Sequence, residues 1–262
     1  MTGRRSLTRL PRLVGATAAL VTLGGLTAAC GPRLPTLSVA DTTCTEGAAC
    51  TFTVSLSATR TTAVSFDYAT ASGQANTQAD YVGTSGRATI AAGSRSVTVN
   101  VSSAGDPLDE DLEDFFLNLG NPSGATIADG QGRATISDDD PPPTLSVGDA
   151  AASEDLDSVE VPLTLSAPSG RTVEVDVITA NVTARASQDY VAVSARYTFV
   201  PGWTTQTVSI GIIDDVLVEP GETFRVNLSG ALNATIADGQ GTVTIVSDDT
   251  PEPCLGAALL PC

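Results

Sequence analysis

Histidine and lysine are both absent from this chain of 262 residues, so its 13 basic side chains are all arginine. Without an imidazole or an amine, no Ser or Cys has an obvious base to activate it, which disfavours nucleophilic catalysis. The absence of His also disfavours zinc, which prefers Cys and His ligands. Aromatic residues make up only 4% of the chain, and we expect the single tryptophan, Trp203, to close the edge of a hydrophobic core.

Positive charge is scarce, because 30 acidic side chains outnumber the arginines and give a formal net charge of -17. Binding to nucleic acid requires clustered Lys or Arg, so we expect no nucleic-acid partner. Hydrophobic residues make up 42% of the chain, which is too many for a disordered acidic tail. The negative charge is therefore expected on a folded surface that tolerates self-repulsion or binds cations.

The first 29 residues are typical of an export signal. Four arginines precede an apolar stretch at residues 14–26, which is too short for a comfortable membrane span. The following segment, Leu26-Thr27-Ala28-Ala29-Cys30-Gly31, resembles a bacterial lipobox, although Thr27 replaces the usual Leu. We therefore expect lipidation of Cys30 and a cell-envelope or secreted location. Ordinary cleavage after Ala29, which would leave a free thiol, is the alternative.

The five cysteines support this reading of the N-terminus. Cys44 and Cys50 form one local pair, and Cys254 and Cys262 form another, so two disulfides are expected and Cys30 is left over. Removing residues 1–29 takes away four of the 13 arginines and no acids. The exported chain would then carry 9 basic and 30 acidic groups, a net charge of -21.

The rest of the chain is an internal repeat with an offset of 109 residues. Eight residues, 125–132, recur letter for letter at 234–241. The same offset aligns many acidic residues: Asp80 with Asp189, Asp106 with Asp215, Glu110 with Glu219, Glu113 with Glu222, Asp139 with Asp248 and Asp140 with Asp249. A repeat of roughly 100 residues is long enough to close its own core, so we expect two domains rather than a solenoid.

Short alternating runs rich in Val, Ile, Thr and Phe predict about seven strands in each copy. They lie at residues 36–39, 51–57, 63–70, 87–90, 96–101, 114–119 and 133–136, and at 144–147, 159–166, 172–179, 196–200, 205–213, 223–228 and 242–246. No window has a helical period. The pattern predicts an all-β chain of two tandem immunoglobulin-like antiparallel β-sandwiches.

Turn residues mark the expected boundaries. Three prolines at 141–143 favour a stiff connection between a first domain at 34–140 and a second at 141–250, followed by a C-terminal tail at 251–262. Asp129-Gly130 and Asp238-Gly239 are hairpin signals, because Gly accepts a positive φ. The acidic run 138–140 ends at the boundary, so a calcium ion bound there would touch the domain junction.

The acidic loops favour calcium as the cation. Ca²⁺ takes six to eight oxygen ligands in irregular geometry, and the segment 214–222 is dense in carboxylates. The paired cysteines disfavour metals that prefer thiolates.

At this point the chain resembles the Calx-β domain family, in which tandem domains occur in sodium/calcium exchangers and in bacterial surface proteins. The resemblance covers nearly all of residues 34–250. It rests on the openings Pro35-Thr36-Leu37-Ser38-Val39 and Pro143-Thr144-Leu145-Ser146-Val147, on the Asp-Tyr pairs, on the acidic loops ending in Phe115 and Phe224, and on the closing acidic runs.

In calcium-binding members these positions converge at one end of the sandwich. The resemblance implies a first site of Glu46, Asp80, Asp106, Glu110, Glu113, Asp138, Asp139 and Asp140. It implies a second site of Glu154, Asp189, Asp214, Asp215, Glu219, Glu222, Asp248 and Asp249. Each copy departs from the full pattern once: Gly105 stands where the second copy has Asp214, and Ser247 stands where the first has Asp138. We therefore expect two sites of different strength.

The expected function is a non-enzymatic, calcium-stabilised surface module for adhesion or protein interaction, with a surface protein or glycan as its partner and a lipid as its only membrane contact. One alternative is a passive spacer that binds no calcium, in which the acids merely solvate loops. A carboxylate-based glycoside hydrolase is a further alternative, but no pair of acids stands out for it.

Overall fold

The computed structural model describes residues 33–250. The expected export signal, the Cys30 lipidation site, the Cys254–Cys262 disulfide and the C-terminal tail all lie outside these residues. Within the described part, no helix is long and apolar enough to span a membrane.

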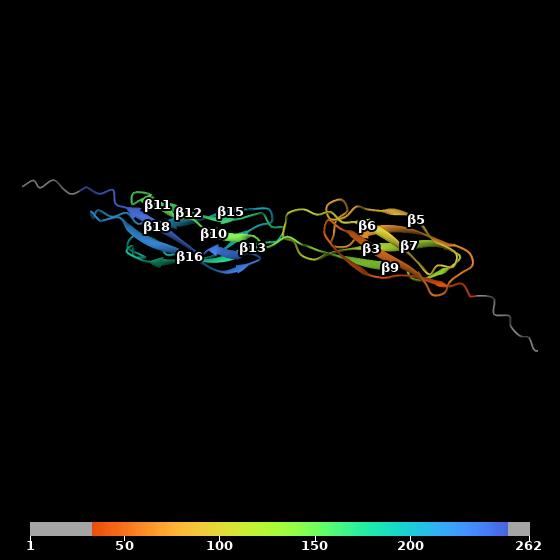
Figure 1. Cartoon of the computed structure of the whole chain (residues 1–262). Coiled ribbons are helices and arrows are strands. Elements are labelled where there is room, and N and C mark those ends of the chain that lie inside the picture. Colours follow the sequence, from red (N-terminus) through yellow and green to blue (C-terminus); the bar gives the residue numbers. More distant parts are fainter. Residues whose placement is uncertain (1–32, 251–262) are drawn as a thin grey trace, which may run out of the picture. The chain divides into compact units, whose positions relative to one another are not determined.

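Each copy folds into nine strands (Figure 1). The first copy contains β1 (Thr36–Val39), β2 (Thr42–Thr45), β3 (Ala49–Leu56), β4 (Val64–Ser72), β5 (Ser85–Ile90), β6 (Ser96–Ser102), β7 (Glu113–Ser123), β8 (Thr126–Asp129) and β9 (Gln131–Ser137). The second contains β10 (Thr144–Val147), β11 (Ala150–Ser153), β12 (Ser158–Leu165), β13 (Val173–Asn181), β14 (Ser194–Phe199), β15 (Thr205–Gly211), β16 (Glu222–Leu232), β17 (Thr235–Asp238) and β18 (Gln240–Val246).

The strands of each copy form one four-stranded and one five-stranded sheet. In the first copy the orders are β6-β3-β1-β8 and β2-β9-β7-β4-β5, and the second copy repeats them as β15-β12-β10-β17 and β11-β18-β16-β13-β14. The expected all-β sandwich is confirmed. The sequence missed two strands per copy, β2 and β8 and their counterparts, which pair in parallel with β9 and β1. Neither β2 nor β8 contains a buried residue, so they lack the alternation of buried and exposed side chains that marks a strand in the sequence.

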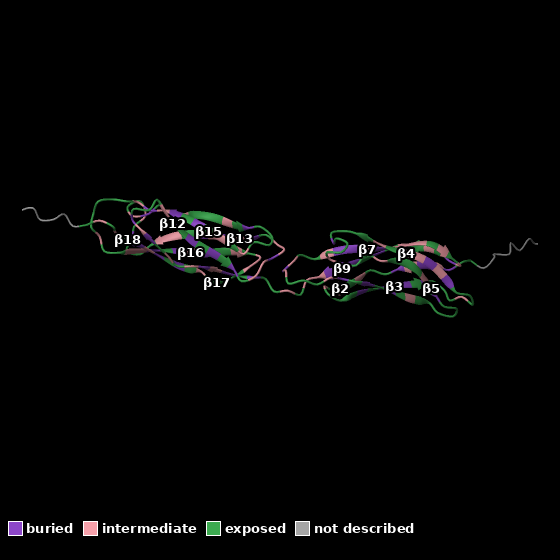
Figure 2. Cartoon of the chain, turned by 90° about the horizontal axis from the view of Figure 1, so that it is seen from above, coloured by how far each residue is buried: buried purple, intermediate pink, exposed green. Residues whose placement is uncertain are grey.

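A separate hydrophobic core lies between the two sheets of each copy. Alternation along β3 is complete, with Cys50, Phe52, Val54 and Leu56 buried and the residues between them exposed. Figure 2 shows this division as buried positions along the strands and exposed positions in the loops. Burial of a large side chain of this kind stabilises a fold by roughly 1.5–3 kcal/mol, so the period-2 pattern accounts for the fold. Trp203 does not take part, because it is 56% exposed, and the expectation that it closes the core edge is wrong.

The identical eight-residue block is not a hairpin, contrary to expectation. Strand β8 pairs with β1, whereas β9 pairs with β7 and β2, so Asp129-Gly130 connects strands of different sheets. The block places a glycine, Gly132 or Gly241, beneath the segment that crosses from β1 to β2 or from β10 to β11. A Cβ on Gly241 would lie 2.5 Å from the carbonyl oxygen of Gly148. Close packing of two backbones therefore explains why glycine occurs there in both copies.

Replacing Gly241 by alanine should lower the free energy of unfolding of the second copy by about 1–3 kcal/mol, because the new methyl group overlaps backbone atoms. Gly120 is the matched control, since a Cβ at that position meets no atom within 4 Å. Calorimetry should show a lower melting temperature for Gly241→Ala and little change for Gly120→Ala. Equal melting of the two variants would contradict this explanation.

Candidate functional site

The acidic residues of each copy lie in loops at one end of its sandwich. In the first copy these segments are the β2–β3 turn, the β4–β5 loop, the β6–β7 loop and the residues after β9. Alternate strands of antiparallel sheets end at the same edge, so these four segments meet although they are far apart in sequence.

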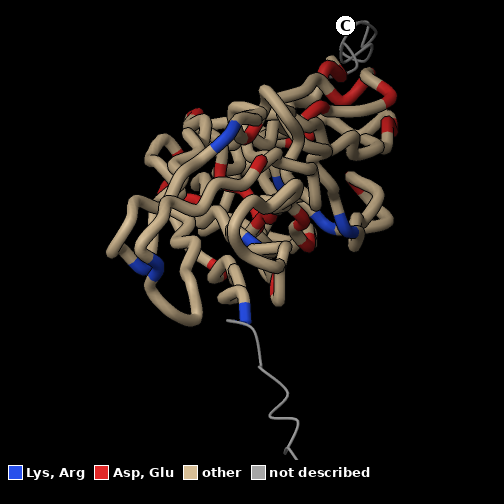
Figure 3. The backbone as a smooth tube through the Cα atoms, turned by 90° about the vertical axis from the view of Figure 1, so that its right-hand side faces the viewer, with Lys and Arg blue, Asp and Glu red and all other residues tan. Residues whose placement is uncertain are grey.

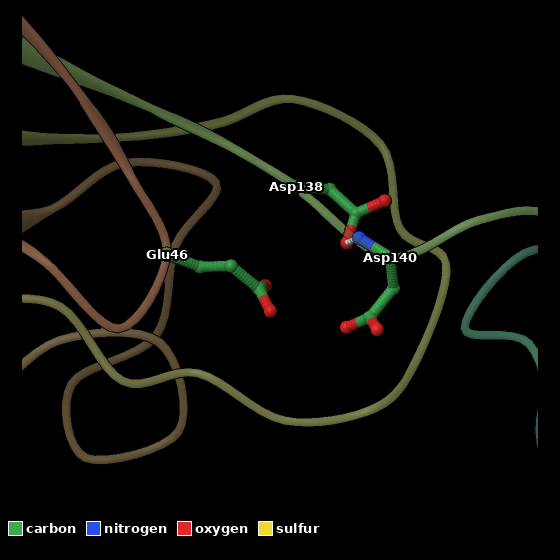
Figure 4. Close-up of side chains that lie close together, drawn as sticks. All are labelled: Glu46, Asp138 and Asp140. Atoms are coloured by element: carbon green, nitrogen blue, oxygen red, sulfur yellow. Dashed lines mark hydrogen bonds between the residues drawn. The ribbon is translucent and has the colours of Figure 1, made fainter.

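Six of the eight carboxylates expected in the first site line a single cavity. Its lining residues are Glu46, Ala79, Asp80, Ala104, Asp106, Glu110, Asp111, Glu113, Ile136 and Asp138. A seventh, Asp140, joins Glu46 and Asp138 in a group whose ligand atoms all lie within 4.8 Å of one another (Figure 4). Asp139 is exposed and belongs to neither set. Asp111 lines the cavity although sequence reasoning missed it, because the second copy has Pro220 at that position.

Backbone hydrogen bonds hold several of these carboxylates in place. The amide of Asn76 donates to Asp80 Oδ2 at 2.5 Å, which closes the loop around the aspartate. The amide of Asp140 donates to Asp138 Oδ1 at 3.3 Å. Within the β4–β5 loop, Gln78 has a φ of 78°, a backbone conformation that residues other than glycine rarely adopt. Such local strain occurs where surrounding contacts hold a loop in one geometry.

An aromatic pair packs close in sequence to the acidic residues. Tyr81, which follows Asp80, stacks on Phe115 of β7 with ring centroids 4.3 Å apart, and both side chains are buried. In the second copy Tyr190 stacks on Phe224 at 4.0 Å. Beside the first pair, Asp114 accepts a hydrogen bond from the amide of Gln74 at 2.9 Å and pairs with Arg133 at 2.6 Å. Asp114 therefore anchors the β4–β5 loop and lies outside the acidic site.

Burial, followed by the crowding of negative charge, raises the pKa values of three glutamates in the first site. Burial, followed by repulsion from Asp80, raises the pKa of Glu113 from 4.5 to about 7. Burial also raises the pKa values of Glu46 and Glu110, and charges on neighbouring aspartates add to the shift. Asp114 shifts the other way, because the Gln74 amide and Arg133 stabilise its charged form and lower its pKa. The site is therefore electrostatically strained when its carboxylates are all charged.

The second copy repeats this arrangement with different residues. Asp189, Glu219 and Glu222 bring ligand atoms within 4.8 Å of one another. The amide of Arg185 donates to Asp189 Oδ2 at 2.6 Å, as Asn76 does to Asp80 in the first copy. Burial and then Asp189 raise the pKa of Glu222. Acidic segments gather close to the point where the described chain ends (Figure 3).

A second group of acids surrounds Glu154, which is only 4% exposed. Burial raises the pKa of Glu154, and the charges of Asp215, Asp249 and Glu219 raise it further. Ser247, which occupies the position of Asp138, lowers the pKa of Glu154 and partly offsets the shift. Burial, followed by repulsion from Asp248, Asp214 and Asp215, raises the pKa of Asp249, so all eight expected acids of this copy lie in or beside the two groups.

One carboxylate oxygen of the second copy lacks a partner. Asp249 Oδ2 is buried and receives no hydrogen bond from any residue that the structure describes. A carboxylate oxygen removed from water needs a donor or a cation, and leaving it with neither is costly. The donor set around it consists of carboxylates, which fits a hard cation such as Ca²⁺ and does not fit zinc.

The difference between Gly105 and Asp214 has a structural cause. The turn between β2 and β3 spans three residues, 46–48, and the corresponding turn between β11 and β12 spans four. In the shorter turn Gly47 approaches Gly105 so closely that a Cβ on Gly105 would lie 3.1 Å from the Gly47 backbone. The missing carboxylate is therefore a consequence of the shorter turn.

A disulfide between Cys44 and Cys50 closes that turn, with Cα atoms 5.0 Å apart, as expected. It links β2 of one sheet to β3 of the other and encloses Glu46. The second copy has Ala152 and Val159 at the paired positions and lacks this link. Closing so short a loop stabilises the fold by about 2 kcal/mol.

The acidic β6–β7 loop of the first copy also contacts the segment before β13. Arg171 lies 3.7 Å from Asp109 and 3.0 Å from Asp111, measured between side-chain nitrogen and oxygen atoms. The hydroxyl of Ser169 donates to the Asp109 carbonyl oxygen at 3.1 Å. A loop that contributes carboxylates to the first site is thereby joined to the second copy.

The chain is similar to a known domain family and to solved structures. A model of the Calx-beta domain family matches residues 35–140 and again residues 137–249. Among solved structures, the calcium binding domain CBD12 of CALX1.1 aligns with 80% of this chain and 99% of its own, at 18% identity and a TM-score of 0.41.

Shorter segments of this chain are similar to short segments of much larger proteins. Sodium/calcium exchanger 1 of Bos taurus is 36% identical over 86 residues, which is 33% of this chain and 9% of the exchanger. Sodium/calcium exchanger 2 of Homo sapiens is 37% identical over 89 residues, 34% of this chain and 9% of that protein. Adhesion G-protein coupled receptor V1 of Danio rerio is 31% identical over 81 residues, 30% of this chain and 1% of the receptor. These matches span at most about a tenth of each relative.

The raised pKa of Glu113 predicts a stability change with pH in metal-free protein. A carboxyl whose pKa rises from 4.5 to about 7 on folding stabilises the fold below pH 4.5, and this contribution is lost as the pH rises through 7. Glu113→Gln should therefore be more stable than the wild type in metal-free buffer at pH 8. Its free energy of unfolding should be higher by on the order of 1 kcal/mol after allowance for solvent screening, and its melting temperature should be higher accordingly. Glu160→Gln, on an exposed strand position, is the control. A Glu113→Gln variant less stable than the wild type at pH 8 would refute the assignment.

Proposed function

Because the chain belongs to the Calx-beta domain family, with matches over residues 35–140 and 137–249, we propose that it is a non-enzymatic calcium-binding module. The ions bind among the carboxylates at the end of each sandwich. Solved structures and exchangers named for calcium are among the proteins that this chain resembles.

The observation that carries the proposal is the convergence of carboxylates in the first copy. Glu46, Asp80 and Glu113 come from three separate segments, yet they line one cavity that contains no arginine. Charges of one sign gathered in this way destabilise the fold unless a cation compensates them. Calcium, when bound, supplies two positive charges and accepts oxygen ligands in irregular geometry.

The two sites differ in construction, which supports different affinities. In the first copy the disulfide fixes the turn that presents Glu46, so this ligand is positioned before an ion arrives. In the second copy the longer turn that carries Glu154 is unbridged. A ligand set that is already in place loses less conformational freedom on binding. We therefore assign the tighter binding to the first site.

Calcium at the first site also stabilises the junction between the copies under this proposal. Asp111 lines the first cavity and pairs with Arg171 of the second copy. An ion that orders the β6–β7 loop holds Asp109 and Asp111 in the geometry that meets Arg171. Ion binding and junction order are therefore linked through one short loop.

The proposed setting is the cell envelope or the exterior, with Cys30 as a lipid anchor and adhesion or protein interaction as the role. The alternative is a passive spacer that binds no calcium. The two functions differ in one measurable property, which is whether calcium stabilises the fold.

Calcium at about ten times its dissociation constant should raise the melting temperature of the full chain by roughly 5–10 °C, because it binds the folded state only. EGTA should reverse the increase. Asp138→Asn/Asp140→Asn should remove the contribution of the first site, and Glu219→Gln/Glu222→Gln that of the second, as followed by calorimetry and calcium titration.

Glu160→Gln is the control for both, because it removes an exposed carboxylate outside the two groups. Unchanged melting of the wild type in calcium and in EGTA would favour the passive spacer. Equal loss of calcium response in Glu160→Gln would show that calcium acts only through net charge.

A further inference from the structure

The second copy exposes three consecutive apolar side chains at its acidic end. Val216 is 86% exposed, Leu217 is 58% exposed and Val218 is 53% exposed, all within the β15–β16 loop. Single exposed apolar residues are common on protein surfaces, but a contiguous group at the tip of a loop indicates an interaction site. We call residues 216–218 the apolar tip.

The apolar tip is held in position by its own loop and by its neighbour. The amide of Leu217 donates to Asp215 Oδ1 at 2.7 Å, which turns the chain at the tip. At the base of the loop, the amide of Ile212 donates to the Asp157 carbonyl oxygen at 3.2 Å. This bond joins the loop to the β11–β12 turn, where Leu156 is a further apolar side chain that is 50% exposed.

The first copy has no equivalent feature and so serves as an internal reference. Its residues at the three positions are Pro107, Leu108 and Asp109, of which Leu108 is half-buried and Asp109 is buried. Its β2–β3 turn, residues 46–48, contains no large apolar residue. The apolar tip is therefore not required to build this sandwich or its acidic loop.

Acidic residues flank the apolar tip on both sides, and an arginine lies in a neighbouring loop. Asp214 and Asp215 precede it and Glu219 follows it, and Glu219 belongs to the group formed with Asp189 and Glu222. Arg185 is exposed in the neighbouring β13–β14 loop, close enough for its charge to lower the pKa of Glu222. Asn76 takes the place of Arg185 in the first copy.

We propose that the apolar tip docks the second copy onto an anionic lipid bilayer when calcium is bound beside it. The inference rests on the proposed function, because without a cation the carboxylates at both ends of the tip repel an anionic surface. With calcium bound, lipid phosphate oxygens complete the coordination of the ion, and Arg185 supplies a second contact to phosphate.

The arrangement of groups matches the layers of a lipid surface. The exposed apolar residues can enter the boundary between headgroups and acyl chains, and a cation held by Asp189, Glu219 and Glu222, together with Arg185, would then meet the phosphates. A protruding tip of three residues is too small to form a stable protein interface alone, which buries about 800 Å² on each partner. A fluid lipid surface closes around such a tip without needing a matching groove.

Vesicles of phosphatidylcholine with about 30% phosphatidylserine test this proposal by sedimentation of the full chain in calcium or in EGTA. The calcium-dependent bound fraction is the readout, because binding through residues 1–29 is the same in both buffers. The wild type should sediment with these vesicles in calcium and much less in EGTA. Val216→Ser/Leu217→Ser/Val218→Ser should weaken calcium-dependent binding by about tenfold or more, since each apolar side chain no longer gains from burial.

Val200→Ser/Leu232→Ser is the matched control, because these residues are about as exposed but lie at the opposite end of the second copy. Calcium binding without vesicles, followed by the melting temperature, separates the two hypotheses. Normal calcium stabilisation without vesicle binding would overturn the docking proposal and leave the proposed function intact. Absence of any calcium response would overturn both.

Two further outcomes also count against the proposal. Equal binding to pure phosphatidylcholine vesicles would contradict a phosphate-bridged anionic surface, and vesicle binding unaffected by the triple serine change would contradict the role of the tip. Insertion itself is measured with Trp203→Phe/Val216→Trp, whose only tryptophan then lies at the tip. Its emission should shift to shorter wavelength with anionic vesicles and calcium, and an unshifted spectrum would show that the tip stays in water.

Discussion

Repulsion between carboxylates gathered at one end of each sandwich is the constraint on which the rest of the structure depends. The strands bring Glu46, Asp80 and Glu113 into one cavity, and burial together with repulsion from Asp80 raises the pKa of Glu113 to about 7. A hydrophobic core must supply enough stability to hold such a cluster together without a cation. Each copy therefore combines a well-packed core with an end that is unfavourable by itself, and a bound cation relieves that cost.

The loops at this end are held by contacts that do not involve a metal. In the first copy the Tyr81–Phe115 stack and the Asp114–Arg133 pair hold the β4–β5 loop, and the Cys44–Cys50 disulfide holds the β2–β3 turn. The second copy keeps the aromatic stack but replaces Asp114 by Thr223, whose carbonyl oxygen accepts two amides of the β13–β14 loop. The same backbone geometry is thus maintained with fewer side-chain links.

Duplication has produced two ends with different chemistry. The first has a short, bridged turn, no room for a side chain at Gly105, and a β6–β7 loop that contacts Arg171. The second has a longer turn, a buried Glu154 and an exposed apolar tip at residues 216–218. An end that contacts the neighbouring copy needs polar partners, whereas an end with no neighbour in the described chain can present apolar side chains outward. This division suits one copy to support and the other to contact a surface.

The sequence by itself determined the all-β sandwich, the two copies, the disulfide and most of the acidic residues that meet, because alternation and repeat spacing are local patterns. It missed β2 and β8, misread the turn at Asp129-Gly130 and placed Trp203 at the edge of the core, where it is 56% exposed. Those features depend on which sheet a strand joins and which backbones touch, as at Gly241 and Gly148. Only the tertiary structure decided that Asp139 stands apart, that Asp111 joins the cavity, and that Val216 lies exposed in the loop that carries Glu219 to Asp189 and Glu222. Sequence spacing specifies a strand's faces, but contacts between distant loops depend on how the two sheets close over the core.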